Sequence, residues 1–308
     1  MKKVMVVGSL NMDLVASVER LPDKGETLFG SHFAIFPGGK GANQAAAAGR
    51  LGASVFLTGC VGGDSFGSQL LDSMRESLVQ TKYIQTGSAT TGTALITVDS
   101  QGSNTIVVIG GANEECSTAQ VDRALADVGE PGVLLVQNEV PAATVEHAIR
   151  TAKEKHWTVL YNPAPVRSFP LELLKSVDVI MPNETEAALL TGLPTGTVEE
   201  AAAAADKLLE RGASHVIITL GDKGALYKNK NETEHIKPYK VKAVDTTAAG
   251  DAYAGGLAAA MAEGKTLKES MQFAAAVAAL SVTKAGAQPS LPRREEVETF
   301  IKEKGMKP

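Results

Sequence analysis

The segment 241–256, VKAVDTTAAGDAYAGG, places Asp251 directly after Gly250, where an alternating apolar stretch that predicts a strand end passes into a small-residue helix pattern. The first N–H groups of a helix have no partner within it, and together with the helix dipole they attract negative charge. A carboxylate among them suits a group that accepts a proton while its neighbours stabilise developing negative charge. Carboxylates also favour the first turn of ordinary helices, so spacing alone indicates either a capped helix or a catalytic anion site.

The stretch 37–43, PGGKGAN, is a second candidate site. Three glycines within four residues carry a steep entropic cost, which usually means that the backbone meets something closely. Lys40 and Asn43 would both face that space, so we predict a ligand loop rather than a plain turn. Lys40 is followed by Gly41 rather than by Ser or Thr, which excludes a P-loop, and no GxGxxG fingerprint for a dinucleotide is present.

Other polar residues follow predicted strands. Asn11 and Asp13 come just beyond the strand at 4–7, and Glu139 follows the strand at 133–137. Open α/β sheets place ligand groups at this edge, and we expect Asp251 to lie there too.

Two further motifs have an ordinary structural explanation beside a functional one. In the motif 183–186, NETE, Asn183 and Glu186 have the spacing of a helix capping box, although Glu186 at a strand end can also hold a hydrated Mg²⁺ against phosphates. The motif 219–224, TLGDKG, is either a plain turn or a turn that meets a nucleotide.

A regular alternation of strands and helices organises the rest of the chain. Two pairs of short alternating segments, at about 14–36 and 92–109, predict a small antiparallel β appendage. The remainder predicts one α/β domain with a mostly parallel sheet covered on both faces. Strands are expected at 4–7, 54–61, 133–137, 158–161, 177–181 and 215–220, and helices at 42–51, 65–76, 142–153, 184–190, 198–210, 266–282 and 293–303.

Composition limits the possible functions. A net charge of −5 over 308 residues argues against a nucleic-acid surface, which needs clustered cations. The apolar run after the basic start is cut short by Asn11 and Asp13, which predicts a buried first strand rather than a signal peptide, and no stretch is long and apolar enough to span a membrane. Cys60 and Cys116 lack metal-site spacing and fit a reducing compartment. We expect a cytoplasmic protein that binds neither nucleic acid nor membranes.

In chain order, the motifs NMD, GGKGAN, NETE, TLGDKG and DTTAAGD resemble those of the ribokinase family of sugar kinases, and the similarity covers essentially the whole chain. The blocks NPAP at 162–165 and KAGAQPS at 284–290 resemble the same family. The resemblance implies a three-layer α/β/α sandwich spanning 1–308 as a single domain, with a β-sheet lid at about 14–36 and 92–109. It also implies transfer of the γ-phosphoryl group of ATP to O5 of D-ribose with Mg²⁺ and K⁺, and a homodimer formed through the lid.

The resemblance also assigns roles to residues. Asp251 would be the base, and the N–H groups of Ala248, Ala249 and Gly250 would form the anion hole. The sugar would contact Asp251 together with Asn11, Met12, Asp13, Gly39, Lys40, Gly41, Ala42, Asn43 and Glu139. ATP would contact Asn183, Thr219, Leu220, Gly221, Asp222, Lys223, Gly224, Gly250, Asp251 and Ala275, with Glu186 holding Mg²⁺ through water. K⁺ would be bound by Asp245, Thr247 and backbone carbonyl groups near Ser281, Lys284, Gly286 and Ser290.

Two departures from the family pattern concern single residues. Many relatives have Gly where this chain has Ala248, although ribokinases commonly carry alanine there. Ala275 stands where some members place a larger polar side chain beside adenine.

Other functions are also compatible with these motifs. A kinase for another sugar or nucleoside, such as deoxyribose, fructose or adenosine, would share these motifs. Asp13 favours ribose, because a carboxylate there can accept hydrogen bonds from two neighbouring hydroxyl groups and gains less from a 2-deoxy sugar. A non-catalytic sugar or nucleotide sensor on the same fold is a further alternative, and the retention of Asp251 argues against it.

Overall fold

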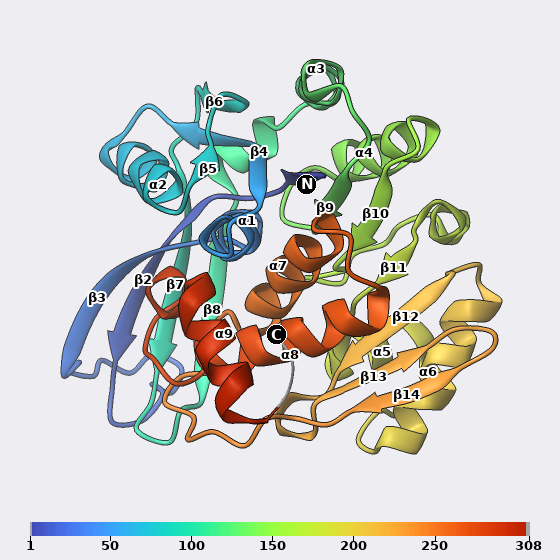
Figure 1. Cartoon of the computed structure of the whole chain (residues 1–308). Helices are drawn as coiled ribbons and strands as arrows, with labels where there is room; N and C mark the ends of the chain where they lie inside the picture. Colours follow the sequence, from blue (N-terminus) through green and yellow to red (C-terminus); the bar gives the residue numbers. More distant parts are fainter. Residues whose placement is uncertain (1, 306–308) are drawn as a thin grey trace.

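A large, mostly parallel sheet forms the centre of the molecule (Figure 1). The structure is a computed structural model that describes residues 2–305, so Met1 and residues 306–308 of the predicted 1–308 domain lie outside the described residues. The strands run in the order β14-β13-β12-β11-β10-β9-β1-β4-β5, with β6 paired to β4 beside this path. Their bounds are β1 Lys3–Val7, β4 Ser54–Gly62, β5 Val79–Gln80, β6 Ile84–Gly87, β9 Val133–Val136, β10 Thr158–Tyr161, β11 Val179–Ile180, β12 His215–Thr219, β13 Ala225–Lys228 and β14 Thr233–Ile236.

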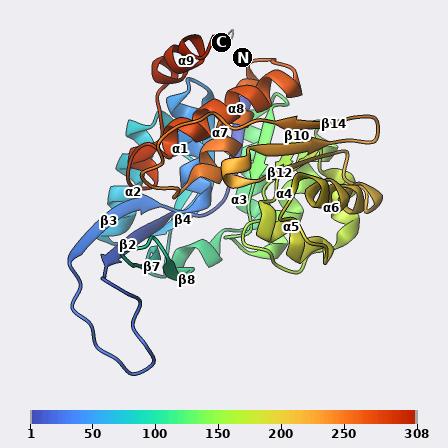
Figure 2. The ribbon, with the colours of Figure 1, turned by 90° about the horizontal axis from the view of Figure 1, so that it is seen from below.

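Helices cover both faces of this sheet, which Figure 2 shows from below. Strand β1 explains the arrangement, since Val4 and Val6 pack into the core on one face while Met5 and Val7 pack into the core on the other. A strand buried on both faces needs a continuous apolar run, as the sequence has. One layer contains α1 Lys40–Arg50, α2 Ser65–Glu76, α7 Ala249–Ala262, α8 Leu267–Ser281 and α9 Arg294–Glu303, and the other contains α3 Thr118–Val128, α4 Ala142–Glu154, α5 Glu184–Thr191 and α6 Val198–Glu210. The predicted three-layer sandwich is therefore confirmed, and none of the described helices is long and apolar enough to cross a membrane.

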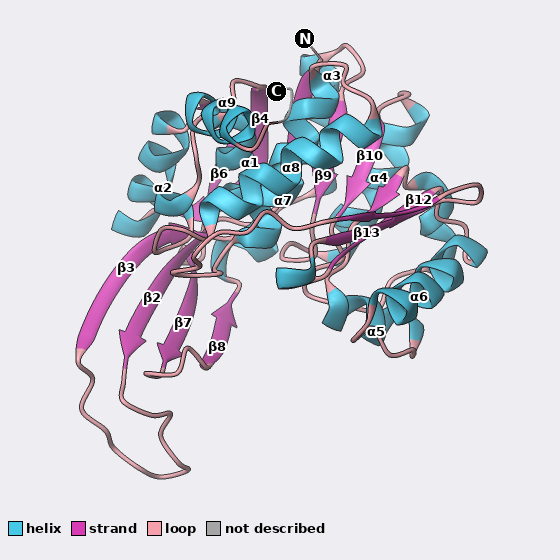
Figure 3. Ribbon diagram, turned by 60° about the horizontal axis from the view of Figure 1, so that its bottom comes forward, coloured by secondary structure: helices cyan, strands magenta, loops and turns pink. Residues whose placement is uncertain are grey.

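A separate four-stranded sheet projects from one side of the molecule (Figure 3). Its strands are β2 Asn11–Ser17, β3 His32–Gly38, β7 Gly92–Val98 and β8 Asn104–Ile109, in the order β3-β2-β7-β8. The two outer pairs, β2–β3 and β7–β8, are antiparallel, as predicted for each pair of short segments, whereas β2 and β7 in the middle are parallel, a pairing that was not predicted. A parallel pair arises because β2 and β7 both leave the large sheet in the same direction.

Two predicted strand ends also differ from the structure. Asn11 and Asp13 belong to β2 of the small sheet, rather than to a loop after β1. Asp251 follows a segment, 237–248, that contains no strand, and the nearest preceding strand, β14, is antiparallel to β13. Asp251 therefore reaches the site from the start of α7 and not from the carboxyl end of a parallel strand. Helix α3 and strands β5, β6, β13 and β14 were not predicted.

Small residues bring α1 and α7 into close contact. A methyl group built on Gly255 of α7 would lie 2.6 Å from the Ala47 Cβ atom and 2.6 Å from the backbone oxygen of Gln44 on α1. Atoms at that distance overlap, so only glycine allows the two helices to approach this closely. The contact places Asn43 and Gln44 of α1 beside Asp251 of α7.

The Gly255→Ala substitution tests this packing. Alanine would ordinarily favour a helix over glycine, so any loss of stability must come from the overlap with α1. We expect the free energy of unfolding, measured by urea denaturation, to fall by about 1–3 kcal/mol. Gly63→Ala is the control, since its Cβ atom would lie 3.7 Å from the Thr86 side chain, an ordinary contact. Equal stability of both variants and the parent chain would contradict the packing argument.

Candidate active site

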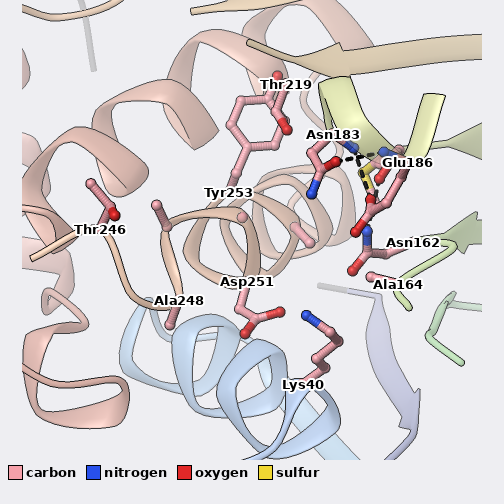
Figure 4. Close-up of a pocket in the computed structure, with 14 residues that line it drawn as sticks. Lys40, Asn162, Ala164, Asn183, Glu186, Thr219, Thr246, Ala248, Asp251 and Tyr253 are labelled. Atoms are coloured by element: carbon pink, nitrogen blue, oxygen red, sulfur yellow. Dashed lines mark hydrogen bonds between the residues drawn. The ribbon is translucent and has the colours of Figure 1, made fainter. Parts of the chain in front are cut away.

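A pocket of about 160 Å³ opens at the start of α7. In Figure 4, Lys40 and Asp251 point into the same space from α1 and α7. Of the predicted residues, the pocket brings together Lys40, Asn183, Glu186, Thr219 and the run 248–251. It is also lined by Asn162, Ala164, Met181, Thr246, Tyr253 and Ala254.

The backbone at the start of α7 has an unusual conformation. Ala248 lies in the left-handed region, with φ 60° and ψ 13°, which a residue with a side chain rarely adopts and which explains why glycine suits this position. The N–H group of Ala249 donates to the Thr246 carbonyl oxygen at 3.2 Å. The N–H groups of Ala248 and Gly250 donate to no residue that the structure describes, so two of the three predicted anion-hole donors are available to a ligand.

The Asp251 carboxylate is held by two amides of α1. Its Oδ2 atom accepts a hydrogen bond from Asn43 Nδ2 at 3.0 Å, and its Oδ1 atom accepts one from Gln44 Nε2 at 2.9 Å. Asp251 is buried, although it lines the pocket. Asn43 was a predicted site residue, whereas no role was predicted for Gln44.

A second cluster of polar residues gathers around Glu139, next to the first. The Glu139 Oε2 atom accepts hydrogen bonds from Ser9 Oγ at 2.6 Å, from the Lys40 backbone N–H at 3.1 Å and from Asn11 Nδ2 at 3.5 Å. Asn113, which was not predicted, fixes Asn11 by donating to its Oδ1 atom at 2.7 Å. Its position in a 3₁₀ turn far along the chain gave no local signal.

Electrostatics in this region are dominated by carboxylates around one lysine. Burial alone would lower the pKa of Lys40, but the charges of Asp251, Glu139, Glu186 and Asp13 outweigh it and raise that pKa. Lys40 therefore stays positively charged in the site.

Two carboxyl groups of this region, those of Asp13 and Glu186, have raised pKa values. Burial, together with the charges of Glu139 and Asp251, raises the pKa of Asp13 to about 7, although Lys40 opposes the shift. Burial also raises the pKa of Glu186, with a smaller contribution from Asp251, against the Asn183 N–H group and Lys40. Both groups would gain from hydrogen-bond donors or cations that a ligand supplies.

The glycines of the 37–43 stretch have a structural role of their own. A methyl group on Gly41 would lie 2.5 Å from the Gly8 backbone, and one on Gly39 would lie 2.6 Å from the backbone nitrogen of Asn11. The close backbone contact inferred from the glycines is therefore a contact with another part of the same chain, the segment 8–11. The side chains of Met12 and Ala42 are fully buried in the core, so only their backbone can face a sugar.

The predicted nucleotide residues are only partly brought together. Asn183 forms the capping box with Glu186 that its spacing predicted, and it bridges to Thr219 on the neighbouring strand, so both face the pocket. The turn after Thr219 lies outside the pocket, and the Leu220 side chain is buried. Ala275 lies on α8, partly buried against the core, and does not line the pocket.

The predicted K⁺ residues fall into two groups. Asp245 links the segment 245–247 to the segment around Gly286. Its carboxylate accepts hydrogen bonds from Thr247 Oγ1 at 2.6 Å and from the Gly286 N–H group at 2.8 Å. Burial would raise the pKa of Asp245, but the hydrogen bonds from Thr247 and Gly286 lower it, so the carboxylate stays ionised and suits a nearby cation. The side chains of Ser281, Lys284 and Ser290 are engaged elsewhere, which leaves their carbonyl groups as possible ligands. The described residues include no cluster of three His, Cys, Asp or Glu side chains ready to hold a metal ion.

Comparison with known proteins gives the family. The family model described as pfkB family carbohydrate kinase matches residues 1–294. The chain belongs to the PfkB family of carbohydrate kinases.

Individual PfkB relatives are similar over their full length. A ribokinase of Haemophilus influenzae is 42% identical over 301 residues, which cover 97% of this chain and 98% of that protein. A deoxyribokinase of Salmonella typhi is 37% identical, covering 97% and 98%. The structure of an Arabidopsis thaliana ribokinase complexed with ribose and ATP superposes with a TM-score of 0.88 at 34% identity, covering 98% of this chain and 99% of that one.

The raised pKa of Asp13 predicts a pH-dependent stability. Between about pH 4 and pH 7 the folded protein keeps a proton on Asp13 that the unfolded chain has lost, so this group lowers the free energy of unfolding as the pH rises. Asp13→Asn removes that contribution. We expect the ligand-free variant to be more stable than the parent at pH 8, by a few kcal/mol at most, and the difference to shrink toward pH 4. Asp72→Asn, at an exposed surface ion pair with Arg75, is the control. A stability difference independent of pH would contradict the assignment.

Proposed function

We propose that this PfkB kinase transfers the γ-phosphoryl group of ATP to O5 of D-ribose, giving D-ribose 5-phosphate and ADP. The observation that carries the proposal is the position of Asp251 at the start of α7. Its carboxylate lies beside two available backbone N–H groups in a pocket that Lys40 borders on one side and Asn183 and Thr219 border on the other. The similarity to enzymes named as ribokinases along nearly their full length supports the same choice.

The proposed reaction requires no covalent bond between these residues and the substrates. Phosphoryl transfer depends on positioning and charge neutralisation more than on covalent chemistry. Asp251 accepts the proton of the sugar hydroxyl as the new O–P bond forms, because that hydroxyl is too weak an acid to lose it earlier. The N–H groups of Ala248 and Gly250 and the Lys40 ammonium group stabilise negative charge on the transferred group.

Two cations belong to the proposal. Mg²⁺ would neutralise charge on the ATP phosphates, and the partly buried Glu186, which lines the pocket, would hold its water shell. K⁺ would be bound by Asp245 and Thr247 with carbonyl groups of 281–290, where the ionised Asp245 supplies the compensating charge. Since Asp245 and Thr247 shortly precede Ala248, an ion there would stabilise the turn that presents the anion-hole donors.

Unpaired acceptors favour a sugar with several hydroxyl groups. The Asn43 Oδ1 atom is buried and has no hydrogen-bond partner among the described residues, and the Asp13 carboxylate accepts no hydrogen bond from them. A site with unpaired buried acceptors discriminates against a ligand that lacks a donor. Deoxyribose is the second candidate substrate, since a deoxyribokinase is among the relatives of comparable identity.

We also propose that the small sheet closes over the sugar and forms the dimer contact. Asn11 and Asp13 lie on its strand β2, so it reaches the site directly. Closure would keep water away from the transferred group. The small sheet carries an exposed apolar set, which suits a contact with a second copy: Phe33, Ile35, Leu95, Ile106, Val107, Val108 and Ile109.

A coupled assay of ADP release over a panel of sugars and nucleosides tests the proposed substrate. We expect kcat/KM to be highest for D-ribose, with 2-deoxyribose, fructose and adenosine lower, because each leaves an acceptor of the site unpaired or misplaced. Faster turnover of 2-deoxyribose than of D-ribose would show that 2-deoxyribose is the preferred substrate. Binding of sugar and ATP without turnover of any panel member would favour a sensor.

Exchange of monovalent cations tests the second ion. Replacing K⁺ by Na⁺ should lower turnover with D-ribose, and Asp245→Asn should remove most of the difference between the two ions. The same assay with Asp99→Asn, which alters an exposed turn of the small sheet, serves as the control. Equal rates in K⁺ and Na⁺ for the parent chain would exclude K⁺ as an activator.

A further inference from the structure

Gln44 contacts the Asp251 carboxylate from a position that no sugar or nucleotide can reach. Its side chain is fully buried, and its Nε2 atom donates to Asp251 Oδ1 at 2.9 Å and to Asn162 Oδ1 at 3.0 Å. Its Oε1 atom accepts from Gln137 Nε2 at 2.5 Å. Both donors and the acceptor of this amide are therefore engaged.

The surrounding bonds fix which way the Gln44 amide points. Asn162 Nδ2 donates to the Met181 carbonyl oxygen at 2.8 Å, which leaves the Asn162 Oδ1 atom as an acceptor facing Gln44. Only the Gln44 nitrogen can satisfy two acceptors, Asn162 Oδ1 and the Asp251 carboxylate, at once. A reversed amide would leave a buried carboxylate oxygen facing another oxygen, a costly arrangement.

This network ties the start of α7 to three strands of the sheet. Gln137 follows β9, Asn162 follows β10 and Met181 follows β11. Gln44 is the link between them and Asp251, and its own place is set by the close approach of α1 to α7 at Gly255. The carboxylate is thus oriented against the central sheet.

We infer that Gln44 is a positioning residue for phosphoryl transfer, which it serves by donating a hydrogen bond to the Asp251 carboxylate and fixing its orientation. The inference rests on the proposed role of Asp251 as base. In that reaction the sugar O–H bond breaks, its proton moves to a free lone pair of Asp251, the sugar oxygen bonds to phosphorus and ADP leaves. The Gln44 N–H group occupies one lone pair of Oδ1, stabilises the anion and leaves the pocket side of the carboxylate for the proton.

Other charged groups also act on the Asp251 carboxylate, in addition to the Gln44 donor. Lys40 of α1 attracts its charge, whereas Asp13 of β2 and Glu186 of α5 repel it. Glu139 belongs to the same cluster around Lys40. A hydrogen bond from an amide favours the charged form of a carboxylate, so the dependence of activity on pH is a suitable readout for removal of the Gln44 donor.

Gln44→Leu tests the inference. We expect kcat to fall roughly 10- to 100-fold, the range for loss of one hydrogen bond to a charged group, with KM for sugar and ATP changed little. The acid-side midpoint of the profile of kcat/KM against pH should move up by about one pH unit. Gln44→Glu, almost the same size, should move that midpoint in the same direction, and it keeps the test open if the leucine variant does not fold.

Gln120→Leu is the matched control. Gln120 is also a buried amide with two donor bonds, to the Gly59 and Tyr83 carbonyl oxygens at 2.7 Å each, but it lies on α3 away from the pocket. It should lose stability while keeping kcat and the pH profile. A shift in Gln120→Leu equal to that in Gln44→Leu would reduce Gln44 to a structural role.

The Asp251→Asn variant distinguishes a failure of the proposed function from a failure of the role of Gln44 alone. If that variant keeps near-normal turnover, Asp251 is not the base and the proposed function fails with it. If it loses turnover while Gln44→Leu and Gln44→Glu keep the parent kcat and pH profile, the role of Gln44 alone is overturned.

Discussion

The close approach of α1 to α7 is the constraint on which the site depends. Gly255 leaves room for the Ala47 side chain and the Gln44 backbone, and this brings two side-chain amides against the Asp251 carboxylate. A carboxylate buried without donors would neutralise itself by binding a proton. The small residues that are so frequent in both helices thus bring these amides to the Asp251 carboxylate, which the proposed reaction uses as its base.

Charge balance at the site is the second requirement. Four carboxylates, those of Asp13, Glu139, Glu186 and Asp251, act on the single ammonium group of Lys40. This excess of negative charge suits a site that receives donors and cations together with its substrates. Burial is the main cause of the raised pKa values of Asp13 and Glu186, and the charges of neighbouring carboxylates add to it.

Patterns local in sequence predicted much of the fold, because periodicity and capping act over a few residues. Helices α2 and α6 have the predicted ends, and the Asn183–Glu186 capping box forms as its spacing indicated. The partners of individual side chains were harder to predict from the sequence. Gln44, Asn113 and Asn162 find their partners more than 15 residues away, and nothing in their immediate neighbours indicates such contacts. The glycines at 38–41 showed that the backbone meets something closely, but not that it meets the chain itself.

The central claim, that Asp251 takes the proton of the sugar hydroxyl, is tested most directly by a structure of the complex with D-ribose and a non-hydrolysable ATP analogue. In that complex we expect O5 of the sugar to lie within about 3 Å of an Asp251 carboxylate oxygen, with the terminal phosphate facing the N–H groups of Ala248 and Gly250. A closed complex in which O5 contacts another residue, and Asp251 lies more than about 5 Å from every sugar hydroxyl, would contradict it.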